Sequence, residues 1–167
     1  MPVEIRRIRA DEWGQLRDLR LRALLDAPDA FGSTYAEESR RTDADWMGWA
    51  ADLAEGGSSF GVVADDGSWI ALAVGAPHRD LPGEAWLFAM WVAPDARHAG
   101  VGRALVEHVV DWARSRDFPV LRLTVTETND AAIHLYERCG FIDQGVRLPL
   151  RAGSDMTTMS MTLDLPT

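Results

Sequence analysis

The segment RHAGVG, residues 97–102, places two glycines beside an arginine and a histidine, where a strand-like run gives way to a helix-like run. The strand-like run is Phe88–Asp95 and the helix-like run is Arg103–Asp117. A helix begins with N–H groups that lack an intrahelical partner, and its dipole adds partial positive charge there. Glycine allows a phosphate close to these groups, and Arg97 and His98 add donors. The segment predicts a binding site for a pyrophosphate group. A strand-to-helix turn that needs glycine only for its backbone conformation could have the same residues.

Two other phosphate motifs are excluded by the residues present. A P-loop requires a Gly-Lys pair, and the chain contains none. A dinucleotide fingerprint would need a small residue at position 105, where the chain has Leu105, and it would belong to a first strand–helix–strand unit. The turn at 97–102 instead follows the fourth predicted strand.

The elements that must position this turn follow from hydrophobic periodicity and from turn residues. The predicted order is β, α, α, β, β, β, α, β, α, β, β. Strands are expected at 3–8, 58–64, 69–76, 85–94, 120–125, from 141 onward, and at 156–165, with 147–155 as a loop. Helices are expected from Asp11, from Thr42 to Leu53, after the glycine turn, and from Asn129 to Gly140. The helix after the turn should bury Val101, Leu105, Val109 and Trp112 as one stripe.

Composition narrows the class of protein. The chain has 167 residues, of which 47% are apolar, which predicts one compact domain over 1–167. A net charge of −9 argues against a general nucleic-acid binder and is compatible with a cationic substrate. The single cysteine and four scattered histidines predict neither a disulfide framework nor a metal site. Because no signal peptide or membrane-length apolar run is found, we expect a cytoplasmic protein without a membrane partner.

Two segments together resemble the signatures of the GCN5-related N-acetyltransferase (GNAT) family. RHAGVG matches R/Q-x-x-G-x-G/A within MWVAPDARHAGVGRALVEHVVDWA, and TETNDAAIHLYERCGF resembles the second signature. The resemblance implies an α/β acyl-CoA N-acyltransferase fold. Its mixed, mostly antiparallel sheet of about seven strands is splayed between the fourth and fifth strands and accompanied by about four helices.

The resemblance also implies a coenzyme site for acetyl-CoA. The backbone of the fourth strand would pair with the pantetheine arm, the glycine turn would take the pyrophosphate, and the next helix would complete the site. The implied cofactor-binding residues are Trp91, Val92, Arg97, His98, Ala99, Gly100, Val101, Gly102, Arg103, Asn129, Ala132 and Tyr136. Asn129 has a second interpretation as a helix N-cap, and the two roles are compatible.

The chemistry of acetyl transfer assigns a general acid. When an amine attacks the thioester, an N–H near Val92 can stabilise the oxyanion, and the departing thiolate needs a proton. Tyr136, whose phenol has an ordinary pKa of about 10, is predicted to donate it. The family's usual glutamate position holds Trp86 here, so we name Glu84 as the catalytic base, with Glu127 as an alternative. Trp86 is then a candidate wall of the acceptor pocket.

These inferences predict an enzyme, an acetyl-CoA-dependent N-acetyltransferase acting on a primary amine of a small molecule or peptide. A cationic acceptor and a homodimer are further expectations. The alternative is a non-catalytic acyl-CoA-binding or regulatory module on the same fold. A third class, an interaction protein whose glycine turn is only structural, would bind no CoA.

Overall fold

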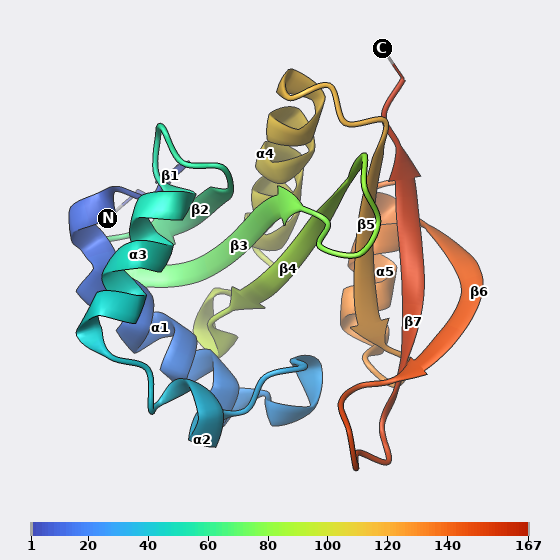
Figure 1. Ribbon diagram of the computed structural model, residues 1–167, viewed down its shortest axis with the longest axis horizontal. Coiled ribbons are helices and arrows are strands. Elements are labelled where there is room, and N and C mark those ends of the chain that lie inside the picture. The colour runs from blue at the N-terminus through green and yellow to red at the C-terminus, as the bar shows by residue number, and fades with distance from the viewer. Residues whose placement is uncertain (1, 167) are drawn as a thin grey trace.

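The computed structural model describes residues 2–166, whose strands form one sheet of seven. The strands lie in the order β1-β2-β3-β4-β5-β7-β6, and all pairs are antiparallel except β4 and β5, which run parallel (Figure 1). They span Glu4–Arg7 (β1), Phe60–Asp65 (β2), Trp69–Pro77 (β3), Glu84–Val92 (β4), Val120–Thr126 (β5), Ile142–Pro149 (β6) and Thr157–Asp164 (β7). The predicted mixed, mostly antiparallel sheet is confirmed.

Helices cover both faces of the sheet. They are α1 (Trp13–Asp26), α2 (Tyr35–Glu38), α3 (Asp43–Leu53), α4 (Val101–Ser115) and α5 (Asp130–Arg138). One core contains the apolar faces of α4 and α5, and the other contains those of α1 and α3, on the opposite face (Figure 1). Short 3-10 turns occur at Ala10–Glu12, Pro28–Ala30 and Pro94–Ala96. No helix within residues 2–166 has the length and apolar character needed to cross a membrane.

Two elements differ from the sequence prediction. The four-residue helix α2 was not predicted, and its start is stabilised by Thr34, whose side chain accepts a hydrogen bond from the Glu37 N–H. Strand β6 continues to Pro149 although residues 147–155 were expected to be a loop. A register shift in β6, between Asp143 and Arg147, interrupts the pairing before the strand resumes. Because β6 is the edge strand, it tolerates proline at its end.

Helix α4 buries the predicted stripe. Val101, Leu105, Val109 and Trp112 are each at most 8% exposed. The close approach of this helix explains Gly75 on β3, because a Cβ at that position would lie 2.8 Å from the Trp112 ring. The crossover from β4 through α4 to β5 therefore holds the glycine turn against the sheet, as the sequence predicted.

Strands β4 and β5 pair over only three residues. Glu84–Trp86 faces Val120–Arg122, and no pairing between the two strands is found beyond them in the described part of the chain. Figure 1 shows the two strands diverging from this point, with the segment between α1 and α2 at the open end. The predicted splay between the fourth and fifth strands is thus confirmed, and it leaves backbone of both strands unpaired at the centre of the sheet.

A bulge in β4 reverses which residues face each layer. Opposite Ala73 of β3, β4 places both Ala89 and Met90, and Ala89 has a φ of +53°. Before the bulge, Leu87 belongs to the core under α4; after it, Trp91 belongs to the core under α1 and α3. An extra residue in one strand shifts the alternation by one, which is the general effect of a bulge.

Candidate active site

The opening between β4 and β5 forms a cleft of about 990 Å³. Its walls come from β4, the turn before α4, the first turns of α5, the segment 27–33 after α1, and the end of β6. On β4 the side chains that line it alternate with buried ones: Trp86, Phe88, Met90 and Val92. Because of the bulge, Phe88 packs toward the core under α1 and α3, whereas Met90 and Val92 pack toward the core under α4 and α5, so this strand is apolar on both faces.

The turn before α4 presents unpaired backbone donors to the cleft. Gly100 is the N-cap, in the left-handed conformation with a φ of +81°, and no side chain caps the helix. The first backbone bond of the helix runs from the Ala104 N–H to the Gly100 carbonyl at 3.1 Å. The N–H groups of residues 101–103 therefore have no intrahelical acceptor, which suits an anion. His98 also has a positive φ, of +67°, so the turn is tightly wound at two positions.

Gly102 keeps the floor of the cleft open. A Cβ added there would lie 3.2 Å from Leu135 of α5 and 3.3 Å from Met90 of β4. Any larger side chain at this position would project between the two elements that line the cleft. The turn thus has both features of a phosphate cradle, free amides and space beside them.

The basic side chains of the turn have partners within the protein. Arg97 donates from Nε to the Val92 carbonyl at 2.8 Å and pairs through Nη2 with Asp26 at 2.9 Å. Arg103 pairs with Glu107 at 3.0 Å along the helix surface. Arg97 thus connects the turn to the ends of β4 and α1, and both arginines also line the cleft.

Tyr136 of α5 lies at the cleft with its ring buried. The residue is 7% exposed and packs edge-on against Phe141, with ring centroids 5.9 Å apart. Burial, together with the nearby Cys139 thiol, raises the pKa of the Tyr136 phenol well above its ordinary value. The hydroxyl therefore stays protonated at neutral pH, the state that a general acid requires.

Asn129 acts as the N-cap of α5, because its Oδ1 accepts the Ala132 N–H at 3.3 Å. Asn129 and Ala132 also line the cleft. The amide nitrogen of Asn129 is not used by the cap, so capping leaves a donor for a ligand. The two interpretations of this residue are compatible in the structure.

The structure separates the proposed base from the proposed acid. Glu84 lies where β4 and β5 still pair, forms an ion pair with Arg122 at 3.0 Å, and does not line the cleft. Glu127 pairs with Arg147 at 3.3 Å and does not line it either. Trp86 does line the cleft and stacks on Phe88 at 4.5 Å. Within residues 2–166, no aspartate or glutamate side chain belongs to the cleft wall.

Most of the other predicted site residues line the cleft, and two do not. Trp91, Val92, Arg97, His98, Gly100, Gly102 and Arg103 line the cleft together with Asn129, Ala132 and Tyr136. Ala99 and Val101 belong to the same turn but are not part of the cleft wall. The Trp91 indole donates to Asp26 at 3.0 Å, so only the backbone of that residue is available to a ligand.

Sequence reasoning missed the side of the cleft made by the segment 27–33 and the end of β6. Arg151 donates to the Phe31 carbonyl at 2.7 Å, and the Thr126 hydroxyl donates to the Asp29 carbonyl. These bonds join segments about 100 or more residues apart in the chain. Arg20 of α1 also lines the cleft. No local pattern could have indicated these contacts, because each depends on the completed fold.

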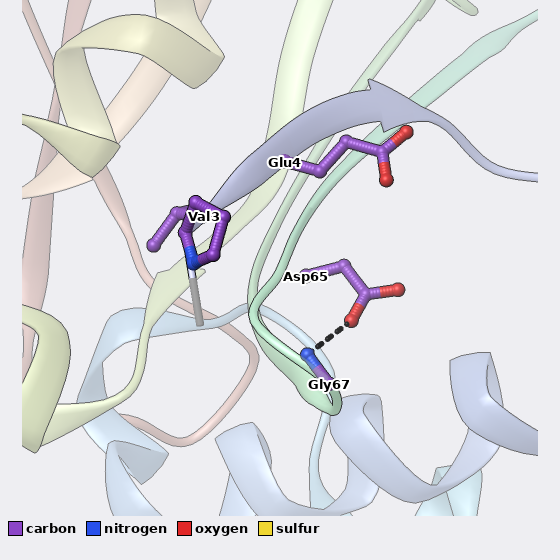
Figure 2. A pocket seen from close by; sticks show the side chains of 5 residues that line it. Val3, Glu4, Asp65 and Gly67 are labelled. Carbon is purple, nitrogen blue, oxygen red and sulfur yellow. Dashed lines mark hydrogen bonds between the residues drawn. The ribbon is translucent and has the colours of Figure 1, made fainter.

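A second pocket lies at the other edge of the sheet, near β1 and the β2–β3 hairpin (Figure 2). Its acidic wall contains Glu4 and Asp65, and Asp65 is already bonded to the Gly67 N–H at 2.9 Å and to Arg6 at 3.0 Å. Across residues 2–166, no group of three or more His, Cys, Asp or Glu side chains is arranged to hold a metal ion. The cleft between β4 and β5 is therefore the candidate active site.

Comparison with known proteins gives consistent matches. The family model described as "Acetyltransferase (GNAT) family" matches residues 13–141. The ribosomal protein bS18-alanine N-acetyltransferase of Escherichia coli is 39% identical over 83 residues, which cover 50% of this chain and 56% of that protein. A GNAT acetyltransferase from Streptococcus pneumoniae superimposes with a TM-score of 0.84 at 19% identity, over 99% of this chain and 100% of the other. An N-acetyltransferase from Thermoplasma acidophilum in complex with coenzyme A has a TM-score of 0.75 at 15% identity, over 99% and 100%.

Proposed function

Because the chain belongs to the acetyltransferase (GNAT) family, we propose that it transfers the acetyl group of acetyl-CoA to a primary amine. The observation that carries the proposal is one cleft lined by the free amides before α4, by Asn129 and by the Tyr136 phenol. The match to the E. coli relative spans about half of each chain, so its substrate is not carried over. Acetyl-CoA supplies the activated acetyl group, and the residues of this chain position it and manage the protons.

The turn before α4 holds the diphosphate in this proposal. Three adjacent N–H groups at residues 101–103, the helix dipole and the open side of Gly102 make a site for an anion without needing a free arginine. Arg97 and Arg103 add positive charge beside it even though each has a carboxylate partner. The pantetheine arm then extends along the unpaired backbone of β4 toward Trp86.

The backbone of β4 near the bulge and the phenol of Tyr136 act on the reacting atoms in this proposal. From the sequence we expected the oxyanion near Val92, but Val92 lies beside Gly102 of the turn. We therefore propose that a backbone N–H of β4 at the bulge, farther along the pantetheine arm, stabilises the oxyanion that forms when the amine attacks the acetyl carbonyl. The C–S bond then breaks, and the phenol of Tyr136 gives its proton to the departing sulfur. The raised pKa of the phenol keeps this proton on Tyr136 at neutral pH, so the residue enters the reaction in its donating form.

The amine loses its proton without a carboxylate in direct contact. Since Glu84 and Glu127 are each paired with an arginine outside the cleft wall, we favour attack by the neutral amine, with water carrying the proton to solvent. Glu84 stays a proposal as the base only through such a water relay. Replacing Glu84 with glutamine tests this, and unchanged activity would remove the residue from the reaction.

The decisive experiment combines acetyl-CoA with a panel of amines and follows thiol release and product mass. Acetylated product above background supports the proposal. CoA binding in calorimetry with no turnover of any amine would instead favour the non-catalytic acyl-CoA module, which the absence of a carboxylate from the described cleft wall keeps open. No CoA binding at all would leave the turn a purely structural feature.

Two expectations, on the cellular location of the enzyme and on its oligomeric state, stay proposals. We propose a cytoplasmic enzyme, because the chain contains a single cysteine and therefore depends on no internal disulfide. We also propose a homodimer. The edge strand β6 supports it, since Ile142 and Leu148 are 66% and 56% exposed there. Sedimentation of the purified protein tests the second expectation.

A further inference from the structure

Arg20 is a buried cation in the wall of the cleft. The residue lies on α1, is 6% exposed, and lines the cleft together with Phe31, over whose ring its guanidinium sits at 4.8 Å. Its Nε donates to Glu38 at 2.8 Å. Its Nη1 is fully buried and has no hydrogen-bond partner within residues 2–166. A guanidinium carries five N–H donors, so most of this group's capacity is unused by the protein.

The charge around Arg20 is not balanced by the protein. Glu38, itself 9% exposed, accepts from Arg20 and also pairs with Arg41 at 3.3 Å. One carboxylate thus serves two guanidinium groups, and within the described residues Arg20 has no other acidic partner. Burying a cation without full compensation is unfavourable, so a cluster with one excess positive charge is expected to have a purpose.

The rest of the cleft wall also favours an anionic ligand. It contains no aspartate or glutamate side chain within residues 2–166, whereas its other arginines lie at the coenzyme turn and at the end of α5. The walls on the acceptor side are otherwise aromatic or apolar, with Trp86, Phe88 and Phe31. A cationic acceptor would find no carboxylate here within the described residues, while an anionic group would find a buried, underused guanidinium.

We infer that the acceptor is a small amine that also carries a carboxylate, and that Arg20 binds this carboxylate. The inference rests on the proposed function and names its substrate class. A guanidinium donates two parallel N–H bonds to a carboxylate with fixed geometry, and the bond is strong because both groups are charged. Binding would place a second negative charge beside the Arg20–Glu38–Arg41 cluster, neutralise it, and hold the amine in the cleft. Arg20 is then a specificity-determining residue that takes no part in bond making.

The test compares acids with their amides. L-leucine, L-methionine and L-phenylalanine suit the apolar walls, and each has an amide that keeps the amine and side chain but loses the carboxylate. For the wild-type protein we expect kcat/KM at least about 10-fold higher for the acids. The amide's amine is the less basic of the two and is more often neutral, so this preference cannot arise from the amine. Equal rates for acid and amide would overturn the inference.

Variants separate recognition from structural support. Arg20→Gln should lower kcat/KM for the acids by about 10- to 100-fold and leave the amides within about twofold. Arg20→Lys should restore part of the loss. Arg41→Gln is the matched control, because it removes the other guanidinium on Glu38 but lies outside the cleft wall. A parallel fall for acids and amides in Arg20→Gln would mean a purely structural role.

Two further measurements keep the test decisive. If Arg20→Gln does not fold by its thermal transition, Arg20→Lys carries the same comparison. If no amine is acetylated, the proposed function fails, and calorimetry on the CoA-loaded protein then judges the inference alone. Heat of binding for the acids, absent for the amides, would support it, and equal or absent binding of both would overturn it.

Discussion

The part of the cleft that we propose for the coenzyme, here the coenzyme half, and the part that we propose for the acceptor, here the acceptor half, are built by different means. The coenzyme half consists of backbone amides, glycines and one phenol, drawn from a strand, a helix and the next helix along the chain. The acceptor half consists of side chains from α1, the segment 27–33, β4 and β6, which are far apart in sequence. A site for a constant ligand can rely on backbone geometry, whereas a site for a particular acceptor depends on which side chains are present.

The two halves also differ in how they treat charge. At the turn before α4, Arg97 and Arg103 each have a carboxylate partner, and the backbone amides are the free donors. In the acceptor half, the free donor is the side chain of Arg20, whose partner Glu38 is shared. Substitutions should therefore weaken the binding of one ligand at a time.

Tyr136→Phe should have the largest effect. Losing the proton donor should lower the rate of the chemical step by about 100-fold or more, with the CoA dissociation constant within about twofold. Rapid-quench single turnovers measure the chemical step even where product release limits kcat. Tyr35→Phe is the control, because Tyr35 is 40% exposed on α2 and is the chain's other tyrosine. An unchanged single-turnover rate in Tyr136→Phe would remove the general-acid role.

The pH dependence gives this prediction a second readout. Burial raises the pKa of Tyr136, so the donating form persists from pH 7 to about pH 10 and is lost only above that range. Over the same interval the acceptor amine deprotonates, and the rate should rise. A fall in rate between pH 8 and 10 that disappears in Tyr136→Phe would show a phenol with an ordinary or lowered pKa, contrary to its burial.

Gly102→Val should weaken the coenzyme half specifically. The new side chain would project between Leu135 and Met90, into the space beside the amides. We expect the CoA dissociation constant to rise by about 30-fold with the KM of the acceptor within about twofold. Gly102→Ala is the graded control, since its Cβ meets only the flexible ends of those side chains. Calorimetry with CoA measures the effect, and equal affinity for all three proteins would place the coenzyme elsewhere.

The elements that make up the proposed coenzyme half could be located from sequence because they are local. The glycine turn, the apolar stripe of α4 and the N-cap Asn129 are each a short run of residues, and a short pattern determines each of them. The splay of β4 and β5 followed from the family resemblance, and the pairing of only three residues confirmed it.

The rest of the site depends on the completed fold. The bulge at Ala89 has no sequence signal, because alanine does not mark a positive φ in the way that glycine does. Phe88 reads as an ordinary core residue of a central strand, and only the splay makes it a wall; Trp86 was expected in the wall only through the family resemblance. Arg20 sits in an amphipathic helix where an arginine predicts a solvated face, and its burial depends on Glu38 and Phe31, which later segments supply.

Trp86→Ala should weaken the acceptor half. The side chain lines the cleft and stacks on Phe88, so its removal would take apolar contact area from the acceptor and loosen the neighbouring ring. We expect the KM of the acceptor to rise by about 10-fold, with the CoA dissociation constant nearly unchanged. Trp49→Ala, at a partly buried tryptophan outside the cleft wall, controls for general loss of packing. Equal effects of the two substitutions would count against a role of Trp86 in acceptor binding.

Arg151→Ala should have the smallest effect, and it tests how independent the two halves are. Arg151 reaches the Phe31 carbonyl from the loop after β6, so its loss frees the segment 27–33 while leaving β4, α4 and α5 in place. We expect the KM of the acceptor to rise about threefold, since the bonds of Arg151 to the Phe31 and Pro28 carbonyls are partly or fully exposed and are each worth about 1 kcal/mol at most. Arg147→Ala, whose ion pairs lie on the surface of β6, is the control. If Arg151→Ala weakened CoA as much as the acceptor, the segment 27–33 would support both ligands. The division of the cleft into a coenzyme half and an acceptor half would then be wrong for the segment 27–33.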